Sequence, residues 1–320
     1  MDRRRRPALA PRRRVDPARA GDGMKGSGTA QVDLHSAFPN DHILTYEYRN
    51  NRRIATPAGK GECAMLTMIA AFAAMPAPGF ATPDAAVAAY GAAVAANDPA
   101  QLAAAFQPSA IMYCTDGAAI RATSQGEWKQ RMRTAGAPAG PISTRIAWID
   151  SGATTSVART ISVRGDREYV DYLLLARLAE GWRIVGKVCE AGARPDKAGD
   201  AGVRQVVDTK LAADRAWDDK RLAESIDARA LVMTVDGGEF VAATLGEWQA
   251  RYVARRAASA GSPATPTSMV VDARGGIGTA RWSFRGTDGS EWTDRALMIR
   301  TPRGWRMAAL AFAREAPGAN

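Results

Sequence analysis

An aspartate and three tyrosines are the side chains best suited to acid–base chemistry in this 320-residue chain. In the strand predicted over 169–178, side-chain alternation places Tyr169 and Asp171 on one face and Tyr172 on the other. A carboxylate that is shielded from water has a raised pKa and can act as a general base. Tyr113, in a strand predicted earlier in the chain, is a candidate hydrogen-bond donor. Asp171 and Tyr113 are therefore the candidate catalytic residues.

A structural role for Asp171 is the alternative, and the sequence favours it. Arg183 lies on the next predicted strand and is a candidate partner for Asp171 in a cross-strand ion pair. Asp294 and Arg306 repeat this combination later in the chain. Because half-buried carboxylates are usually paired with a cation, we expect Arg183 to neutralise Asp171.

Histidine chemistry is excluded from most of the chain. The only two histidines are His35 and His42, which removes Ser-His-Asp and Cys-His catalysis and the commonest zinc, iron and copper sites from residue 65 onward. There is no Cys-x-x-Cys motif and no P-loop. The single Gly-x-Gly-x-x-Gly match, at Gly21, follows no predicted strand. We therefore expect no cofactor and no metal.

The net charge of +10 is concentrated at the start of the chain. Residues 1–64 hold 13 Lys and Arg against 7 Asp and Glu, whereas the remaining residues hold 30 against 26. The aromatic residues are not interleaved with a basic stripe, so we expect no nucleic-acid partner. Residues 1–64 are predicted to be a basic, disordered leader or a reading frame that begins too early.

Residues 65–81 resemble the core of a signal peptide. An apolar run over 65–75 has the length of a signal-peptide core, and small residues around Ala81 suit cleavage. The run is too short to cross a bilayer, so we expect no stable membrane span. We favour an exported protein, periplasmic or secreted. The alternative is a cytoplasmic protein in which a disordered basic tail joins a buried apolar segment.

An internal repeat sets the domain organisation. At a shift of 120 residues Gly126-Glu127-Trp128 aligns with Gly246-Glu247-Trp248, and at a shift of 123 Gly181-Trp182-Arg183 aligns with Gly304-Trp305-Arg306. Such self-similarity indicates a tandem duplication. The expected organisation is a first domain over 82–190, a linker over 191–202 and a second domain over 203–315.

Each copy is predicted to contain two helices, a hairpin, a third helix and four further strands, an α+β layout. Ser124 and Glu127 form a capping box that begins the third helix, and Asp116-Gly117 suits the hairpin turn. In the first copy the expected elements are helices 84–96 and 98–106, hairpin strands 110–114 and 118–122, and strands 142–150, 156–164, 169–178 and 182–189.

The Asp-Gly hairpin, the Gly126-Glu127-Trp128 helix and the ending Gly181-Trp182-Arg183-Ile184-Val185 resemble the nuclear-transport-factor-2-like superfamily, in its branch of "putative lumazine-binding" and polyketide-cyclase-like proteins. The resemblance covers about 84–190 well and 203–315 less well. It implies two tandem cone-shaped domains, each a curved, mostly antiparallel sheet wrapped around three helices. It also implies a pocket between the concave face of the sheet and the helices. No position matches a complete catalytic motif of that superfamily.

Trp128 and Arg131 lie on the predicted third helix and recur as Trp248 and Arg251. The tryptophan covers a ligand pocket or anchors the helix on the sheet, and the usual burial of large aromatics favours the anchor. The arginine receives an anionic ligand or covers the Trp ring, and the sequence does not separate these roles. With the implied pocket, the candidate ligand-binding residues are Tyr113, Trp128, Arg131, Tyr169 and Asp171.

The two cysteines after the leader, Cys114 and Cys189, have two interpretations. In an exported protein they can form a disulfide. The alternative is two buried thiols that pack as small apolar groups, and the sequence favours the thiols.

Two classes of function remain open. The one we favour is a non-catalytic module that binds a small apolar or aromatic ligand, or that pairs its two domains within the chain. The alternative is a cofactor-free isomerase, cyclase or dehydratase with an Asp/Tyr pocket in the first domain. The first copy is the better candidate for a ligand with polar groups, because the second replaces three tyrosines: Tyr113 by Met233, Tyr169 by Trp292 and Tyr172 by Arg295.

Overall fold

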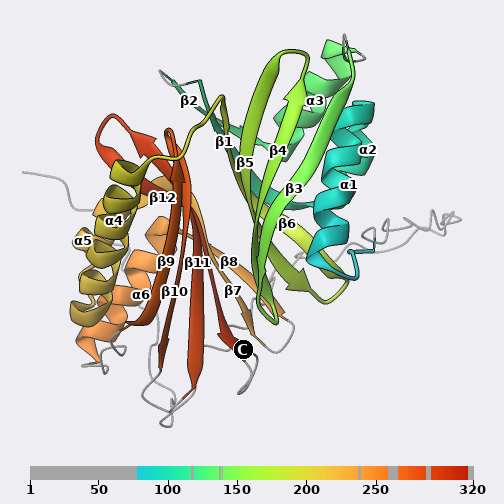
Figure 1. Cartoon of the computed structure of the whole chain (residues 1–320). Helices are drawn as coiled ribbons and strands as arrows, with labels where there is room; N and C mark the ends of the chain where they lie inside the picture. Colours follow the sequence, from blue (N-terminus) through green and yellow to red (C-terminus); the bar gives the residue numbers. More distant parts are fainter. Residues whose placement is uncertain are drawn as a thin grey trace, which may run out of the picture. The chain divides into compact units, whose positions relative to one another are not determined.

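The computed structural model describes residues 78–116, 119–136, 138, 140–236, 239–258, 266–285 and 290–315, which all belong to one compact unit, Pro57–Asn320. The predicted leader and residues 65–77 of the predicted export segment lie outside the described residues. Within the unit, two α+β domains follow one another along the chain, as the sequence predicts (Figure 1).

The first domain contains three helices and a six-stranded sheet. Its elements are α1 (Pro83–Ala96), α2 (Pro99–Ala105), β1 (Phe106–Thr115), β2 (Ile120–Ser124), α3 (Gln125–Ala135), β3 (Ile142–Ser151), β4 (Thr155–Arg164), β5 (Arg167–Leu178) and β6 (Gly181–Ala191). The second domain repeats this order with α4 (Lys197–Ala216), α5 (Asp219–Ser225), β7 (Ile226–Asp236), β8 (Glu239–Thr244), α6 (Leu245–Ala257), β9 (Pro266–Arg274), β10 (Ile277–Arg285), β11 (Glu291–Thr301) and β12 (Gly304–Glu315).

Equivalent capping signals bound the helices of both domains. The side chains of Ser124 and Thr244 begin α3 and α6, and each exchanges hydrogen bonds with a glutamate three residues later in the predicted capping box. At the other end, α1 and α4 each finish at a residue in the left-handed conformation, Asn97 with φ 51° and Trp217 with φ 50°. The helices therefore begin and end at equivalent positions of the repeat.

Both sheets have the same topology. The strand orders are β2-β1-β6-β5-β4-β3 and β8-β7-β12-β11-β10-β9. Only the pairs β1 with β6 and β7 with β12 are parallel among the described strands, so the predicted mostly antiparallel sheets are confirmed. Strand β1 begins before its expected start at residue 110, because Phe106 already pairs with Ile184 of β6.

Helix α4 begins inside the segment that the sequence assigns to a linker. The side chain of Asp196 accepts a hydrogen bond from the backbone N–H of Gly199 and forms the N-cap. The apolar residues that made the helix recognisable start only at Val203, which is fully buried. The first turns of α4 are polar, and for this reason the apolar pattern places the start of the helix too late.

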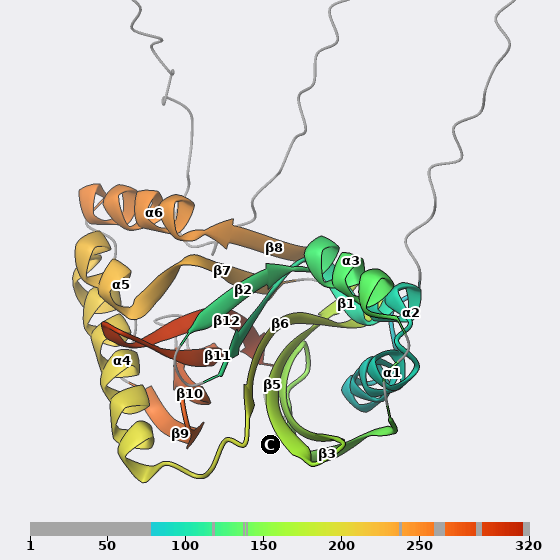
Figure 2. The same cartoon turned by 90° about the horizontal axis from the view of Figure 1, so that it is seen from above.

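The first sheet divides its side chains between two apolar clusters, as strand alternation predicts. On one face, Leu173 and Leu175 of β5 pack with Tyr90 of α1 and with Phe106. Figure 2 shows β3, β5 and β6 curving around α1 on this side. Asp171 lies on this face, because its carboxylate contacts Tyr90. The opposite face of β5 carries Tyr172 and Leu174, which belong to a different cluster.

That different cluster joins the two sheets. Tyr172 and Leu174 of the first domain pack there with Leu297 and Ile299 of β11. Ion pairs accompany the apolar contacts, including one between Arg159 and Asp272 with an N–O distance of 2.6 Å.

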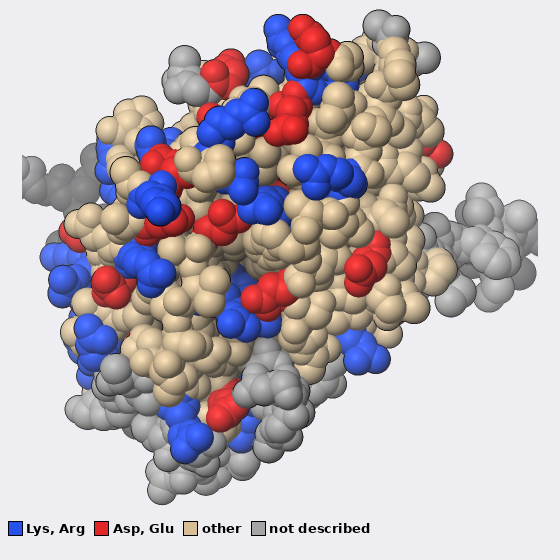
Figure 3. Space-filling view, in the orientation of Figure 1, with Lys and Arg blue, Asp and Glu red and all other residues tan. Residues whose placement is uncertain are grey.

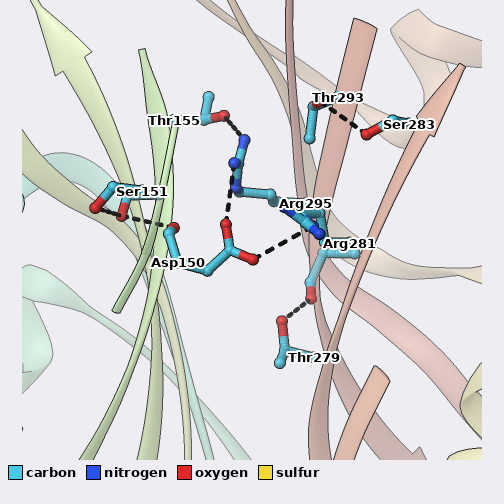
Figure 4. Close-up of polar contacts among 10 residues, drawn as sticks. Asp150, Ser151, Thr155, Thr279, Arg281, Ser283, Thr293 and Arg295 are labelled. Atoms are coloured by element: carbon cyan, nitrogen blue, oxygen red, sulfur yellow. Dashed lines mark hydrogen bonds and ion pairs between the residues drawn. The ribbon is translucent and has the colours of Figure 1, made fainter. Parts of the chain in front are cut away.

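A network centred on Asp150 of β3 connects the sheets at a second point. Arg295 of β11 lies 3.2 Å from the Asp150 carboxylate and donates a hydrogen bond of 2.8 Å to Thr155 (Figure 4). Arg281 of β10 lies 3.3 Å from the other oxygen of the same carboxylate. Since Arg295 is 2% exposed, the Asp150 carboxylate compensates a buried charge.

Candidate functional site in the first domain

A pocket of about 430 Å³ lies between α3 and the helix-facing side of the first sheet. Strands β1, β2, β5 and β6 supply most of its wall. The residues that give it chemical character are Trp128 of α3, Tyr169 and Asp171 of β5, and Lys187 of β6. The volume is in the range typical of small-molecule sites.

A buried polar cluster forms part of the pocket wall. The Tyr90 hydroxyl donates a hydrogen bond of 2.6 Å to Asp171 Oδ2. Lys187 Nζ lies 3.0 Å from the same oxygen and donates a hydrogen bond of 2.5 Å to the Tyr90 hydroxyl. The Thr160 hydroxyl is a further donor to Asp171, at 3.5 Å. The side chains of Lys187 and Asp171 are only 4% and 2% exposed, so these contacts replace water.

Two aromatic rings and the helix–sheet core surround the lysine. Lys187 Nζ lies 4.8 Å from the centre of the Tyr90 ring and 5.0 Å from that of Trp128. Burial lowers the pKa of Lys187, and the negative charge of Asp171 opposes this effect only in part. Burial, with Asp171 beside it, raises the pKa of Tyr90 well above its usual value. Tyr90 therefore remains a proton donor in the cluster at neutral pH.

Four arginines add positive charge to the pocket lining: Arg121 of β2, Arg131 of α3, Arg164 of β4 and Arg167 of β5. Arg131 donates a hydrogen bond of 3.0 Å to Thr123. Arg164 lies over the Tyr169 ring, 5.0 Å from its centre, and its buried Nε has no hydrogen-bond partner in the described part of the chain. None of the four forms an ion pair with a carboxylate among the described residues. The lining also contains the carboxylates of Asp116, Asp171 and Glu190, so with Lys187 the pocket keeps a net positive charge, which favours an anion.

The structure brings four of the five predicted ligand-binding residues to this pocket: Trp128, Arg131, Tyr169 and Asp171. Tyr113 lies on the opposite face of the sheet, where its hydroxyl donates a hydrogen bond of 3.2 Å to Asp227 of the second domain. Burial, followed by the charge of Asp227, raises its pKa. Tyr172 also lies on that opposite face. Two of the three tyrosines that distinguished the first copy in sequence therefore lie in the cluster between the two sheets.

The expected ion pair between Asp171 and Arg183 is wrong. In the β5–β6 register Asp171 is opposite Cys189, whereas Arg183 is opposite Ala176 near the other end of the strand pair. Arg183 instead contacts Glu180 and donates a hydrogen bond of 2.6 Å to the carbonyl of Ala104.

The expected pair between Asp294 and Arg306 is wrong for a similar reason. In the β11–β12 register Arg306 is opposite Ile299. The buried cation beside Asp294 is Lys210 of α4, at 3.0 Å.

The preference for unpaired thiols is also wrong, because Cys114 and Cys189 form a disulfide. The two residues are directly opposite in the parallel β1–β6 pair, with a Cα–Cα distance of 4.5 Å. The two cysteines are 75 residues apart in sequence, so their pairing could be predicted only once the pairing of β1 with β6 was known. Both cysteines line the pocket.

Sequence reasoning missed Lys187 and Tyr90. A usable signal was present for Lys187, because it interrupts the apolar strand predicted over 182–189 and shares a strand face with Cys189. Tyr90 stands out only as the single aromatic residue in the alanine-rich helix α1. Its relation to Asp171 depends on how the helix packs across the sheet.

The second domain has a related buried cluster with different members. Lys210 of α4 lies 2.7 Å from Asp214 and 3.0 Å from Asp294. The Tyr252 hydroxyl of α6 donates a hydrogen bond to Asp214. Burial lowers the pKa of Lys210, but the two carboxylates outweigh it and the net shift is upward. On the same helix as Tyr252, Arg251 covers the Trp248 ring at 4.7 Å.

Neither a metal site nor a membrane span emerges from the described residues. They contain no cluster of three or more His, Cys, Asp or Glu side chains arranged to hold a metal ion. None of their helices combines the length and apolar character that a bilayer span requires. On the face drawn in Figure 3, basic and acidic side chains are mixed rather than gathered in one stripe.

Comparisons with known proteins found a family model and solved structures that are similar to parts of the chain. No curated protein matches the chain. An NTF-2-like protein of unknown function from Silicibacter pomeroyi is 18% identical, with 34% of this chain and 91% of that chain covered and a TM-score of 0.32. An NTF2-like protein of unknown function from Methylobacillus flagellatus is 23% identical, with 34% and 87% covered and a TM-score of 0.31.

The family match is confined to the first domain. Residues 80–190 match the family described as "Putative lumazine-binding". These residues include every element from α1 to β6, apart from Ala191 at the end of β6. The second domain repeats the same elements in the same strand order. The family match thus covers the first of two tandem domains that share one order of elements.

Proposed function

We propose that the first domain is a non-catalytic binding domain for a small, flat ligand that carries an anionic group. The observation that carries the proposal is the pocket of about 430 Å³ whose four lining arginines have no carboxylate partner among the described residues. An anion that enters the pocket gains charge-assisted hydrogen bonds without displacing an existing ion pair.

The aromatic residues of the pocket support a planar ligand body. Trp128 and Tyr169 both line the pocket. Arg164 stacks on Tyr169 and extends the flat surface that this ring offers. Because the first domain matches a family described as lumazine-binding, a pteridinedione is the first planar compound to test. Its ring has faces that can stack on aromatic side chains and polar edges that can form hydrogen bonds.

The second domain is, in this proposal, a packing partner without a matching anion site. Arg251, which aligns with Arg131 in the repeat, covers the Trp248 ring. We therefore infer one ligand per chain. The stoichiometry of binding tests this inference directly.

Calorimetric titration of the full chain with lumazine and with 6-carboxylumazine tests the proposal. We expect the carboxylate form to bind more tightly, with one site per chain and with affinity that falls as salt is added. Arg131→Gln should weaken its binding by about tenfold, which corresponds to roughly 1.4 kcal/mol, the scale of one charge-assisted hydrogen bond.

Arg251→Gln is the matched control, since it removes the aligned arginine from the second domain. Its affinity should equal that of the unmodified chain. Equal losses in the two variants, or the absence of binding by either compound, would contradict the proposal.

The alternative, a cofactor-free isomerase, cyclase or dehydratase that uses Asp171 as a base, has less support. Such a base needs a carboxylate oxygen directed at a proton of the substrate rather than at donors of the protein itself. Asp171 Oδ2 already accepts from Tyr90, Lys187 and Thr160. Tyr113, the other candidate catalytic residue, contacts Asp227 on the opposite side of the sheet. These contacts favour a binding role.

We further propose that the chain is exported. The support is the Cys114–Cys189 disulfide together with the signal-peptide pattern in the sequence over 65–81. Fractionation of the source cells should place the mature chain outside the cytoplasm. A cytoplasmic chain with both thiols free would overturn this assignment.

A further inference from the structure

Lys187 is a buried amine in the wall of the pocket, and the proposed binding role leaves it unused. Its Nζ contacts one carboxylate, Asp171, and one hydroxyl, Tyr90. The groups that face it are Asp171 from β5, Tyr90 from α1, Trp128 from α3 and, at longer range, Arg164 from β4. A single anion therefore balances this cation, and a second cation lies close by.

An amine in these surroundings has the properties of a nucleophile. The neutral form of lysine attacks carbonyl groups, and a low-dielectric environment favours that form. Burial lowers the pKa of Lys187 in agreement with its geometry. The hydrogen-bonded Asp171 is placed to take the proton that the amine must lose.

Lys210 in the second domain shows the opposite arrangement. It is held between Asp214 and Asp294, at 2.7 and 3.0 Å. The two carboxylates stabilise the ammonium form and raise the pKa of Lys210. The chain therefore carries, at the same level of burial, an internal control for the reactivity of Lys187.

We propose that Lys187 forms an imine with a small aldehyde or ketone that carries a carboxylate or phosphate and binds in the first-domain pocket. This inference rests on the proposed binding function, since the same four arginines hold the anionic group. It adds the chemical class of the ligand, an anionic carbonyl compound, and a covalent link to one named atom.

The reaction balances with the groups present. Lys187 Nζ gives one proton to Asp171 and attacks the carbonyl carbon, which forms the C–N bond. A second proton moves from nitrogen to the carbonyl oxygen and yields the carbinolamine hydroxyl. Asp171 returns its proton to that hydroxyl, which leaves as water while the C=N bond forms. The protonated imine keeps the single positive charge of the original ammonium, and nothing is oxidised or reduced.

The test uses pyridoxal 5′-phosphate as a probe, because it combines a flat ring, a phosphate and an aldehyde. The full chain is incubated with the probe, treated with sodium cyanoborohydride to reduce the imine, and mapped by peptide mass spectrometry. We expect one principal adduct, on Lys187. Labelling of Lys187 should exceed that of the exposed Lys220.

The pH profile gives a readout that a purely structural lysine would not produce. Labelling of Lys187 should reach half its maximum below the pH expected for an ordinary lysine, because burial lowers its pKa. Lys210 should remain unlabelled over the same range, because Asp214 and Asp294 retain its proton.

Two variants and one analogue separate the possible failures. Lys187→Arg keeps the positive charge beside Asp171 but cannot form an imine, so it should lose the adduct while it still binds pyridoxine 5′-phosphate, which has an alcohol in place of the aldehyde. Lys210→Arg should keep the adduct. If pyridoxine 5′-phosphate binds but Lys187 is not labelled, the imine is refuted and the binding function stands. If neither compound binds, both are refuted.

Discussion

The two domains bury an aspartate at the same position of the repeat but neutralise it from different elements. Asp171 of β5 meets Lys187, which belongs to the neighbouring strand β6. Asp294 of β11, 123 residues later, meets Lys210, which belongs to helix α4. Each lysine aligns with an uncharged residue of the other copy: Lys187 with Leu310, and Lys210 with Tyr90.

This exchange shows what the fold requires and what it leaves open. A carboxylate on the helix-facing side of the sheet has lost its water and needs a cation within hydrogen-bond distance. In the first domain the cation comes from the neighbouring strand β6, and in the second it comes from the helix α4. The requirement therefore applies to the cluster as a whole, and no single position has to be a lysine.

The clusters also differ in charge balance. In the first domain one lysine faces one aspartate, with Tyr90 as a donor. In the second domain one lysine faces two aspartates, and burial raises the pKa of Asp294 even beside Lys210. The lysine in the second domain is thus held more firmly in its charged form. The first domain keeps a less stabilised cation in the wall of its pocket.

Removal of each aspartate in turn should show the difference between the two clusters most clearly. Asp171→Ala leaves Lys187 buried without a carboxylate, which should lower the free energy of unfolding by about 3–5 kcal/mol. Asp294→Ala leaves Lys210 with Asp214, so the loss should be about 1.5–3 kcal/mol, the scale of one charge-assisted hydrogen bond. Urea unfolding at neutral pH, followed by tryptophan fluorescence, measures both. Equal losses would show that the second carboxylate does not compensate.

The disulfide is a second difference between the domains. Cys114 and Cys189 correspond to Thr234 and Phe312, which are opposite in the β7–β12 register. Replacement of both cysteines by alanine should lower stability by about 2–4 kcal/mol, through the loss of a cross-link between positions 75 residues apart. Calorimetric scans with and without a reducing agent measure the effect. A reducing agent should not change the melting of the double variant, and any further shift there would assign the effect to another cause.

Moving the lysine of the first domain from β6 to α1, the position that α4 uses in the second domain, should have the smallest and most specific effect on stability. Lys187→Leu alone removes the cation from Asp171, and Tyr90→Lys alone places two lysines beside it. The double variant restores one lysine, now on α1, as in α4. We expect it to be more stable than the sum of the single changes by about 0.5–3 kcal/mol. Simple additivity in this double-mutant cycle would show that the helix position cannot replace the strand position.

The sequence alone determined the duplication, the order of elements and the division of strand faces. These features depend on local signals, such as the capping boxes at Ser124 and Thr244, and on alternation along single strands, which placed Tyr169 and Asp171 on one face and Tyr172 on the other. Such signals involve residues a few positions apart. These features can therefore be predicted without knowledge of the tertiary structure.

Only the tertiary structure decided which residues meet. Asp171 pairs with Lys187 rather than Arg183 because the register of β5 with β6 cannot be read from either strand. Cys114 meets Cys189 because β1 and β6 are parallel neighbours in the sheet, although four strands and a helix separate them along the chain. Tyr90 reaches Asp171 only when α1 lies across the sheet, 81 residues away in sequence. Partners at such separations are selected by the packing of the whole domain, since each local segment is compatible with several of them.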